Sequence, residues 1–145
     1  RLVSQSPVRI LVLAVGRLRP PFADDVQHYQ KLLAGHTRLE VVELREDAKV
    51  AGRIPERAHV VLLDSGGRQL SSEQLAEWLE ERRQAGLDLC FVVGGPRGLA
   101  LERCDTKLSF GPMTLSHELA RVVLYEQLFR ALSIEAGMSY HREPL

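Results

Sequence analysis

The sequence predicts an α/β domain built on a mostly parallel sheet flanked by helices. Apolar runs recur at residues 8–15, 60–63 and 87–93, and strands that are apolar on both faces are typical of parallel sheets covered on each side. Segments with helical spacing lie between these runs, and alternation of strands with helices indicates an α/β fold. We expect one domain over residues 8–145, preceded by a poorly ordered leader at residues 1–7.

Each element has its own local signal. Residues 39–44 alternate in part, which predicts a more exposed strand. Apolar side chains at helical spacing predict a helix after Pro20-Pro21 that ends at Gly35. Ser71 with Gln74 forms a capping box, which predicts a second helix that ends at Gly86. Residues 46–57 are charged and broken by glycine and proline, so we expect a loop or one poor helix there.

The last helix, expected over residues 117–136, has apolar side chains on more than one face. A narrower polar strip runs along it, formed by Glu118, Arg121, Glu126, Arg130 and Ser133. A surface helix of a monomer needs only a stripe about 100° wide, so the excess indicates burial on two sides. The second side faces either a partner subunit or the core of the same chain, and the pattern alone leaves both alternatives open.

Composition excludes several classes of protein. The 145 residues include 19 basic and 19 acidic side chains, so no global field favours nucleic acid or a membrane surface. The apolar run at residues 10–15 is far shorter than the roughly 20 residues of a membrane span. Cys90 and Cys104 lack C-x-x-C spacing, and we expect reduced thiols of a cytoplasmic protein, with Cys90 in the core. No histidine pair has metal-binding spacing, so we expect no metal site.

Three segments look able to bind a ligand. Residues 94–98 form a glycine turn after a buried strand, ahead of a short helix expected at residues 99–103, and residues 64–68 form a second such turn. Glycines there let backbone amides approach a ligand at the carboxyl edge of the sheet, although ordinary tight turns have the same composition. Residues 109–116 either cap the last helix through Thr114 and Ser116 or cradle an adenine-like ring.

Polar side chains mark both ends of the last helix. His117 begins the helix, and Tyr140-His141-Arg142 lies near the end of the chain. A segment at that position is most often a frayed tail. Against this, arginine binds phosphates and planar anions, and histidine titrates near neutral pH. These residues are therefore candidates for proton transfer and anion binding.

With these motifs the chain resembles the SPOUT methyltransferases, and within them the RlmH family. The resemblance covers nearly the whole chain from Val8 and is most specific in the final third. The segments that carry it are 14–16, 62–64, 91–99, 108–110, 113–115, 117, 121–124, 126–128, 130–131 and 140–143.

The resemblance implies a fold and an activity. RlmH enzymes use S-adenosyl-L-methionine to methylate N3 of a pseudouridine in the 23S RNA of the large ribosomal subunit. They fold as an α/β sheet with a C-terminal trefoil knot and act as homodimers with the active site at the subunit interface. The resemblance thus favours a partner subunit on the last helix. The competing interpretation is a non-catalytic nucleotide-binding or ribosome-associated module that uses the same pocket.

The resemblance also assigns site residues. The expected cofactor contacts are Leu63, Gly94, Gly95, Gly111, Pro112, Met113, Thr114, Leu115 and Ser116. Tyr140, His141 and Arg142 are expected to reach the RNA from the partner subunit. Arg142 would stabilise the deprotonated base, and His141 would accept the N3 proton, with His117 as second choice. Tyr140 would position the tail or stack on a base. A chain of balanced charge binds free RNA weakly, so we expect an assembled ribosomal particle as substrate.

Overall fold

The computed structural model describes residues 9–95 and 99–142, with the backbone alone for Arg142; the expected leader at residues 1–7 lies outside these ranges. The described strands form one sheet of order β2-β1-β4-β3-β5, and every pair of neighbours is parallel. Their bounds are β1 Arg9–Val15, β2 Arg38–Leu44, β3 His59–Gln69, β4 Leu89–Val93 and β5 Thr106–Ser109. The α/β class with a parallel sheet is confirmed.

The α-helices begin where the capping signals predict. They are α1 Phe22–Ala34, α2 Ser72–Gln84 and α3 His117–Glu135. The Ser71 hydroxyl accepts from the Gln74 backbone N–H at 3.0 Å, and the Gln74 side chain accepts from the Ser71 N–H at 2.8 Å. Ser116 caps α3 by accepting from the Leu119 N–H at 3.2 Å. Each cap satisfies backbone donors that the first turn of a helix leaves free.

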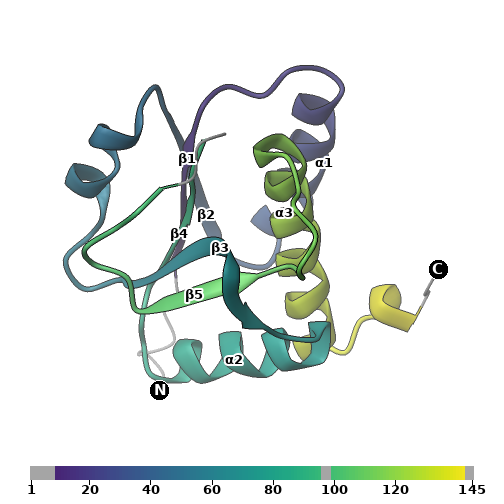
Figure 1. The fold of residues 1–145 in the computed structure, drawn as a ribbon. Coiled ribbons are helices and arrows are strands. Elements are labelled where there is room, and N and C mark those ends of the chain that lie inside the picture. The colour runs from purple at the N-terminus through teal and green to yellow at the C-terminus, as the bar shows by residue number, and fades with distance from the viewer. Residues whose placement is uncertain (1–8, 96–98, 143–145) are drawn as a thin grey trace.

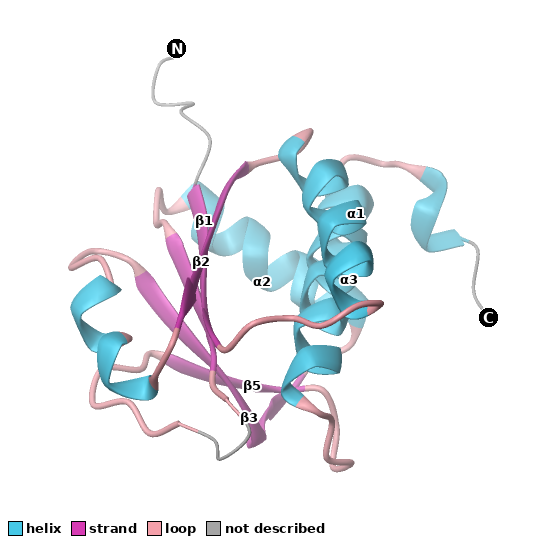
Figure 2. Cartoon of the chain, turned by 90° about the horizontal axis from the view of Figure 1, so that it is seen from above, coloured by secondary structure: helices cyan, strands magenta, loops and turns pink. Residues whose placement is uncertain are grey.

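The two faces of the sheet are covered differently. All three α-helices pack on one face, where Phe91, Leu124 and Leu128 are buried in the larger apolar core (Figure 1). The other face is covered by two short 3₁₀ helices, η2 Asp47–Lys49 and η3 Ala51–Arg53, together with residues 99–104 (Figure 2). The prediction of a short helix at residues 99–103 is wrong. This segment lacks regular structure and packs Leu99 and Leu101 against the sheet.

The prediction of a second glycine turn is also wrong. Residues 64–68 continue β3, with a shift in its pairing to β5 between Leu63 and Arg68. A Cβ on Gly67 would lie 2.7 Å from the carbonyl carbon of Lys107. Glycine is therefore needed because another backbone approaches closely, and such a position is typical of an irregular strand. The sequence signal for β5 itself is weak because the strand has only four residues.

The polar strip along α3 is largely buried. Glu118, Arg121 and Ser133 are buried, while Glu126 and Arg130 are half-buried. Glu118 and Arg121 are tolerated inside because oppositely charged side chains from the β1–α1 loop and from β2 reach them. The helix therefore uses polar contacts as well as apolar packing to hold its position on the sheet.

Candidate functional site

A cavity of about 490 Å³ lies at the carboxyl edge of the sheet, within the size range of small-molecule sites. The ends of β3, β4 and β5 and the beginning of α3 form it, and this is the edge where parallel α/β sheets bind ligands. Its walls combine apolar side chains with the backbone of two glycine-bearing segments. The lining residues are Arg19, Leu63, Asp64, Ser65, Val93, Gly94, Gly95, Leu99, Leu108, Phe110, Gly111, Met113, Thr114, Leu115, Ser116, His117, Glu118 and Ala120.

The structure thus brings together nearly all of the expected cofactor residues. Leu63, Gly94 and Gly95 meet the loop 111–116 at this one cavity, and His117 lies beside them. Pro112 belongs to the same loop and is exposed rather than part of the lining. The apolar Met113 side chain is 82% exposed at the mouth. Such exposure of a large apolar side chain is typical of a surface that a ligand or partner covers.

The loop that enters the cavity is shaped by Ser109. This side chain is buried, and its hydroxyl accepts from the Gly111 N–H at 3.1 Å. The carbonyls of Gly111 and Ser65 lie 3.0 and 3.1 Å from the same hydroxyl, which can donate to one of them at a time. Gly111 has φ +120°, a conformation that only glycine adopts readily. Residue type and hydrogen bonds therefore determine the path of this loop.

His117 packs against the end of β1. Gly16 has φ +100°, and a Cβ added there would lie 3.6 Å from Nε2 of His117. The imidazole therefore lies over the backbone of the β1–α1 loop while it lines the cavity. Position and chemistry make it able to exchange a proton with a bound ligand.

Arg19 and Glu118 form an ion pair at the edge of the cavity. The Arg19 Nη2 atom donates to Glu118 at 2.6 Å, and the Arg19 backbone N–H donates at 2.8 Å. The side-chain hydrogen bond and then the backbone one hold the pKa of Glu118 below its ordinary value. No sequence pattern reveals this pair, because local spacing does not relate residues so far apart in the chain.

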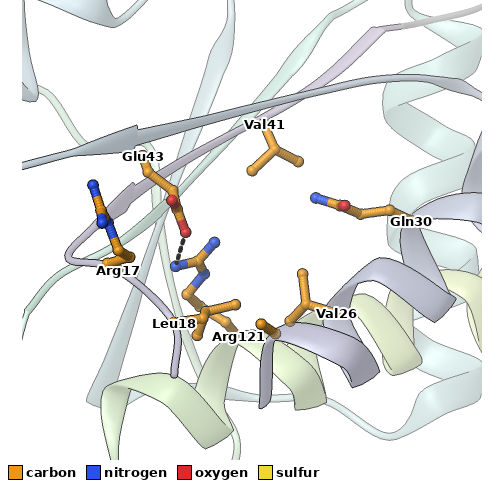
Figure 3. A pocket seen from close by; sticks show the side chains of 8 residues that line it. Arg17, Leu18, Val26, Gln30, Val41, Glu43 and Arg121 are labelled. Atoms are coloured by element: carbon orange, nitrogen blue, oxygen red, sulfur yellow. Dashed lines mark ion pairs between the residues drawn. The ribbon is translucent and has the colours of Figure 1, made fainter. Parts of the chain in front are cut away.

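A second cavity, of about 390 Å³, lies under α1 beside β2. Figure 3 shows Arg121 and Glu43 pointing toward one another in it, and Val41 of β2 and Gln30 of α1 also line the cavity. The Arg121 guanidinium is 3.0 Å from the Glu43 carboxylate, and its Nη1 atom donates to the Gly16 carbonyl at 3.4 Å. The same contacts tie α3 to β2 and to Gly16, which directly follows β1.

The expected C-terminal residues lie apart from the cavity within one chain. They form the short helix η4 Ser139–Arg142, which packs on α3. Tyr140 bonds to Glu126, and nine residues of helix between His117 and Glu126 correspond to roughly 14 Å. His141 contacts Arg130 and Glu73. The Arg142 side chain lies outside the described part of the structure.

Comparison with known proteins identifies the family. A family model described as "Predicted SPOUT methyltransferase" matches residues 8–141. This chain belongs to the SPOUT methyltransferases. The chain matches curated relatives over nearly their full length. One from Rubrobacter xylanophilus is 44% identical, and the match covers 92% of this chain and 98% of the relative. Another from Stenotrophomonas maltophilia is 40% identical, with 90% and 97% covered. Both relatives are named "Ribosomal RNA large subunit methyltransferase H".

A more distant relative carries the same name. The protein from Gemmatimonas aurantiaca is 36% identical to this SPOUT chain, with 93% of this chain and 100% of the relative covered. Among solved structures, TrmJ from Z. mobilis ZM4 matches with a TM-score of 0.47 and 13% identity, over 86% of this chain and 69% of that one.

Two features are absent from the described residues of this SPOUT chain. None of their helices has the length and apolar character needed to cross a bilayer. No group of three His, Cys, Asp or Glu side chains among residues 9–95 and 99–142 is arranged to hold a metal ion.

Proposed function

We propose that this protein transfers a methyl group from S-adenosyl-L-methionine to N3 of a pseudouridine in the 23S RNA of the large ribosomal subunit. The observation that carries the proposal is the match of at least 90% of the chain to rRNA methyltransferases of one name. The cavity supports it, since the segments expected to bind the cofactor line one space.

The residues of the cavity fit this cofactor. Phe110, Leu108 and Leu63 offer an apolar wall for an adenine ring, and Asp64 offers an acceptor for ribose hydroxyls. At Gly95 an added Cβ would lie 3.3 Å from Cγ1 of Val15, so the backbone there leaves little room for a side chain. When bound, S-adenosyl-L-methionine supplies a methyl group already activated on a sulfonium. The protein must then align the acceptor and remove the N3 proton.

We assign removal of the N3 proton and stabilisation of the negative charge on the base to polar residues near the two ends of α3. Arg142 would stabilise the anion of the deprotonated base through its planar guanidinium. His141 would accept the N3 proton, and His117, which lines the cavity, is the second choice. Tyr140 would position the tail or stack on a base.

A homodimer would bring these two groups together. The tail and the cavity lie at different positions along α3 of one chain, so a single copy separates them. A second copy packed against α3 in the opposite direction would place its tail at the cavity of the first. Met113 and Leu119, which are 82% and 39% exposed at the beginning of α3, supply apolar surface for this contact. The C-terminal part of this chain would form the trefoil knot of the family.

The substrate proposed is the assembled ribosomal particle in the cytoplasm. With 19 basic and 19 acidic residues the chain lacks the excess charge that drives binding to free RNA. Shape and contacts of the particle would supply the missing specificity.

Labelled cofactor tests the proposal directly. The protein is incubated with labelled S-adenosyl-L-methionine and either ribosomal particles from a strain that lacks the modification or a short isolated RNA stem-loop. We expect label at a pseudouridine of 23S RNA in the particle and little in the stem-loop. Cofactor binding without label in any RNA would instead support the non-catalytic module. Efficient labelling of the stem-loop would contradict the particle as substrate.

A further inference from the structure

The tail of the chain is anchored by Glu126 and Arg130 of α3. One carboxylate oxygen of Glu126 accepts from Tyr140 Oη at 2.9 Å and from Arg130 Nη2 at 2.9 Å. The Arg130 guanidinium also lies over the Tyr140 ring, 4.8 Å from its centre, and Phe129 packs edge-on against the same ring. Tyr140 is therefore held by its hydroxyl, its face and its edge at once.

Arg130 extends the same contacts to His141. Its Nη1 atom lies 3.1 Å from Nδ1 of His141, and Nε2 of His141 lies 2.8 Å from a carboxylate oxygen of Glu73. A guanidinium can only donate and a carboxylate can only accept. His141 is consequently the neutral tautomer with its proton on Nε2, and both ring nitrogens are engaged.

Burial separates the inner contacts from the outer one. The Glu126 and Arg130 side chains are each 19% exposed, whereas Glu73 is 64% exposed. Exposed ion pairs contribute little because water and salt screen them. Two donors on one edge of the Arg130 guanidinium, Nε at 3.2 Å and Nη2 at 2.9 Å, form a fork that converges on the same Glu126 oxygen in a partly buried site, where charge-assisted hydrogen bonds are strong. The Glu126–Arg130 pair is thus the stronger anchor of the tail.

We propose that Glu126 and Arg130 are positioning residues for methyl transfer, which set the place of Tyr140 and the tautomer of His141. This inference rests on the proposed function. Nδ1 of His141 can accept the N3 proton only after its hydrogen bond with Arg130 breaks. The Glu126–Arg130 pair therefore keeps the imidazole in this neutral form until the substrate competes with Arg130 for Nδ1. Neither residue needs to touch the base, because each acts through the tail.

Turnover on ribosomal particles tests the anchor. Glu126→Gln removes the charge that pairs with Arg130, and Arg130→Lys keeps the charge but loses the fork. We expect each to lower kcat roughly tenfold or more, with KM for particles changed less than about threefold, since misplaced groups impair the reaction more than binding. Tyr140→Phe, which loses only the hydroxyl bound to Glu126, should lower kcat in the same direction. Glu80→Gln, which breaks the Glu80–Arg83 pair on α2, is the matched control and should behave as wild type.

The second readout is independent of catalysis. Nitrogen-15 NMR of the histidine side chains in the full-length protein should show His141 as the Nε2–H tautomer, and Arg130→Lys should shift it toward a mixture of tautomers. Wild-type kcat in Glu126→Gln and Arg130→Lys, or an Nδ1–H tautomer of His141 in the wild type, would overturn the proposal. If the wild type itself labels no RNA, the proposed function fails, whereas the NMR result still decides whether the anchor exists.

Discussion

Arg121 and Glu43 connect the beginning of α3 to the end of β2 through a contact of 3.0 Å between guanidinium and carboxylate. The Arg121 side chain is only 2% exposed, whereas Glu43 is 43% exposed. The pair therefore joins a buried guanidinium to a partly exposed carboxylate, and both line the second cavity (Figure 3). Because Arg121 also donates to the carbonyl of Gly16, which follows β1, one side chain fixes α3 against both β2 and the end of β1.

Arg121→Met should destabilise the fold by about 2 kcal/mol, since it removes a charge-assisted hydrogen bond while keeping most of the apolar volume. Urea denaturation measures the loss in free energy of unfolding. The control is Arg83→Met on α2, whose ion pair with Glu80 is more exposed and should be worth less than about 1 kcal/mol. Equal losses in the two variants would show that burial of Arg121 adds nothing.

Gly67→Ala should lower stability by about 1–3 kcal/mol, because the new Cβ would meet the backbone of Lys107 and Leu108 at 2.7–2.9 Å. Gly66→Ala is the matched control, since its Cβ would lie 3.4 Å from a flexible Asp64 oxygen. Thermal unfolding of both variants measures the difference. Similar midpoints would contradict the close approach of β3 and β5.

Gly95→Val should abolish cofactor binding, because the first added carbon already lies 3.3 Å from Val15 and the branches would extend into the lining of the cavity. Calorimetric titration with S-adenosyl-L-methionine measures the affinity. Gly52→Ala, at a position with nothing within 4 Å, should bind as wild type does. Unchanged affinity in Gly95→Val would remove this glycine from the site.

The Arg19–Glu118 pair should make stability depend on pH. Arg19 holds the pKa of Glu118 below its ordinary value near 4.5, so the stabilisation is fully present above that value and is lost as pH falls through the lower folded pKa. Glu118→Gln should therefore melt below wild type at pH 7, and the gap should narrow below about pH 4. A gap that stays constant from pH 7 to pH 3 would rule out this contribution.

The two cysteines should differ in reactivity. Burial raises the pKa of Cys90 to about 11, and its side chain is fully covered, whereas Cys104 is half-buried. A thiol reagent at pH 8 should modify Cys104 in the folded protein and both cysteines in denaturant. Cys104→Ser should abolish the reaction of the folded protein. Fast modification of Cys90 in that variant would contradict its place in the core.

Local signals in the sequence determined much of the fold. The apolar runs predicted β1, β4 and the first part of β3, because a strand covered on both faces must be apolar throughout. Ser71, Gln74 and Ser116 marked the beginnings of α2 and α3, since a cap uses residues three apart in the chain. The family resemblance, rather than a local signal, implies that Gly95 and the loop 111–116 belong to one site, and both segments line the same cavity.

Only the tertiary structure decided the relationships that depend on distant residues. Glu118 and Arg121 belong to a polar strip in the sequence, and their burial is possible because Arg19 and Glu43 reach them from other elements. The extension of β3 past Gly67 required the backbone of β5 beside it. Tyr140 and His141 are held in place because α3 and α2 bring polar side chains to them. These side chains are Glu126, Arg130 and Glu73. Residue order specifies hydrogen bonds within a turn, whereas contacts between distant segments exist only once the chain has packed.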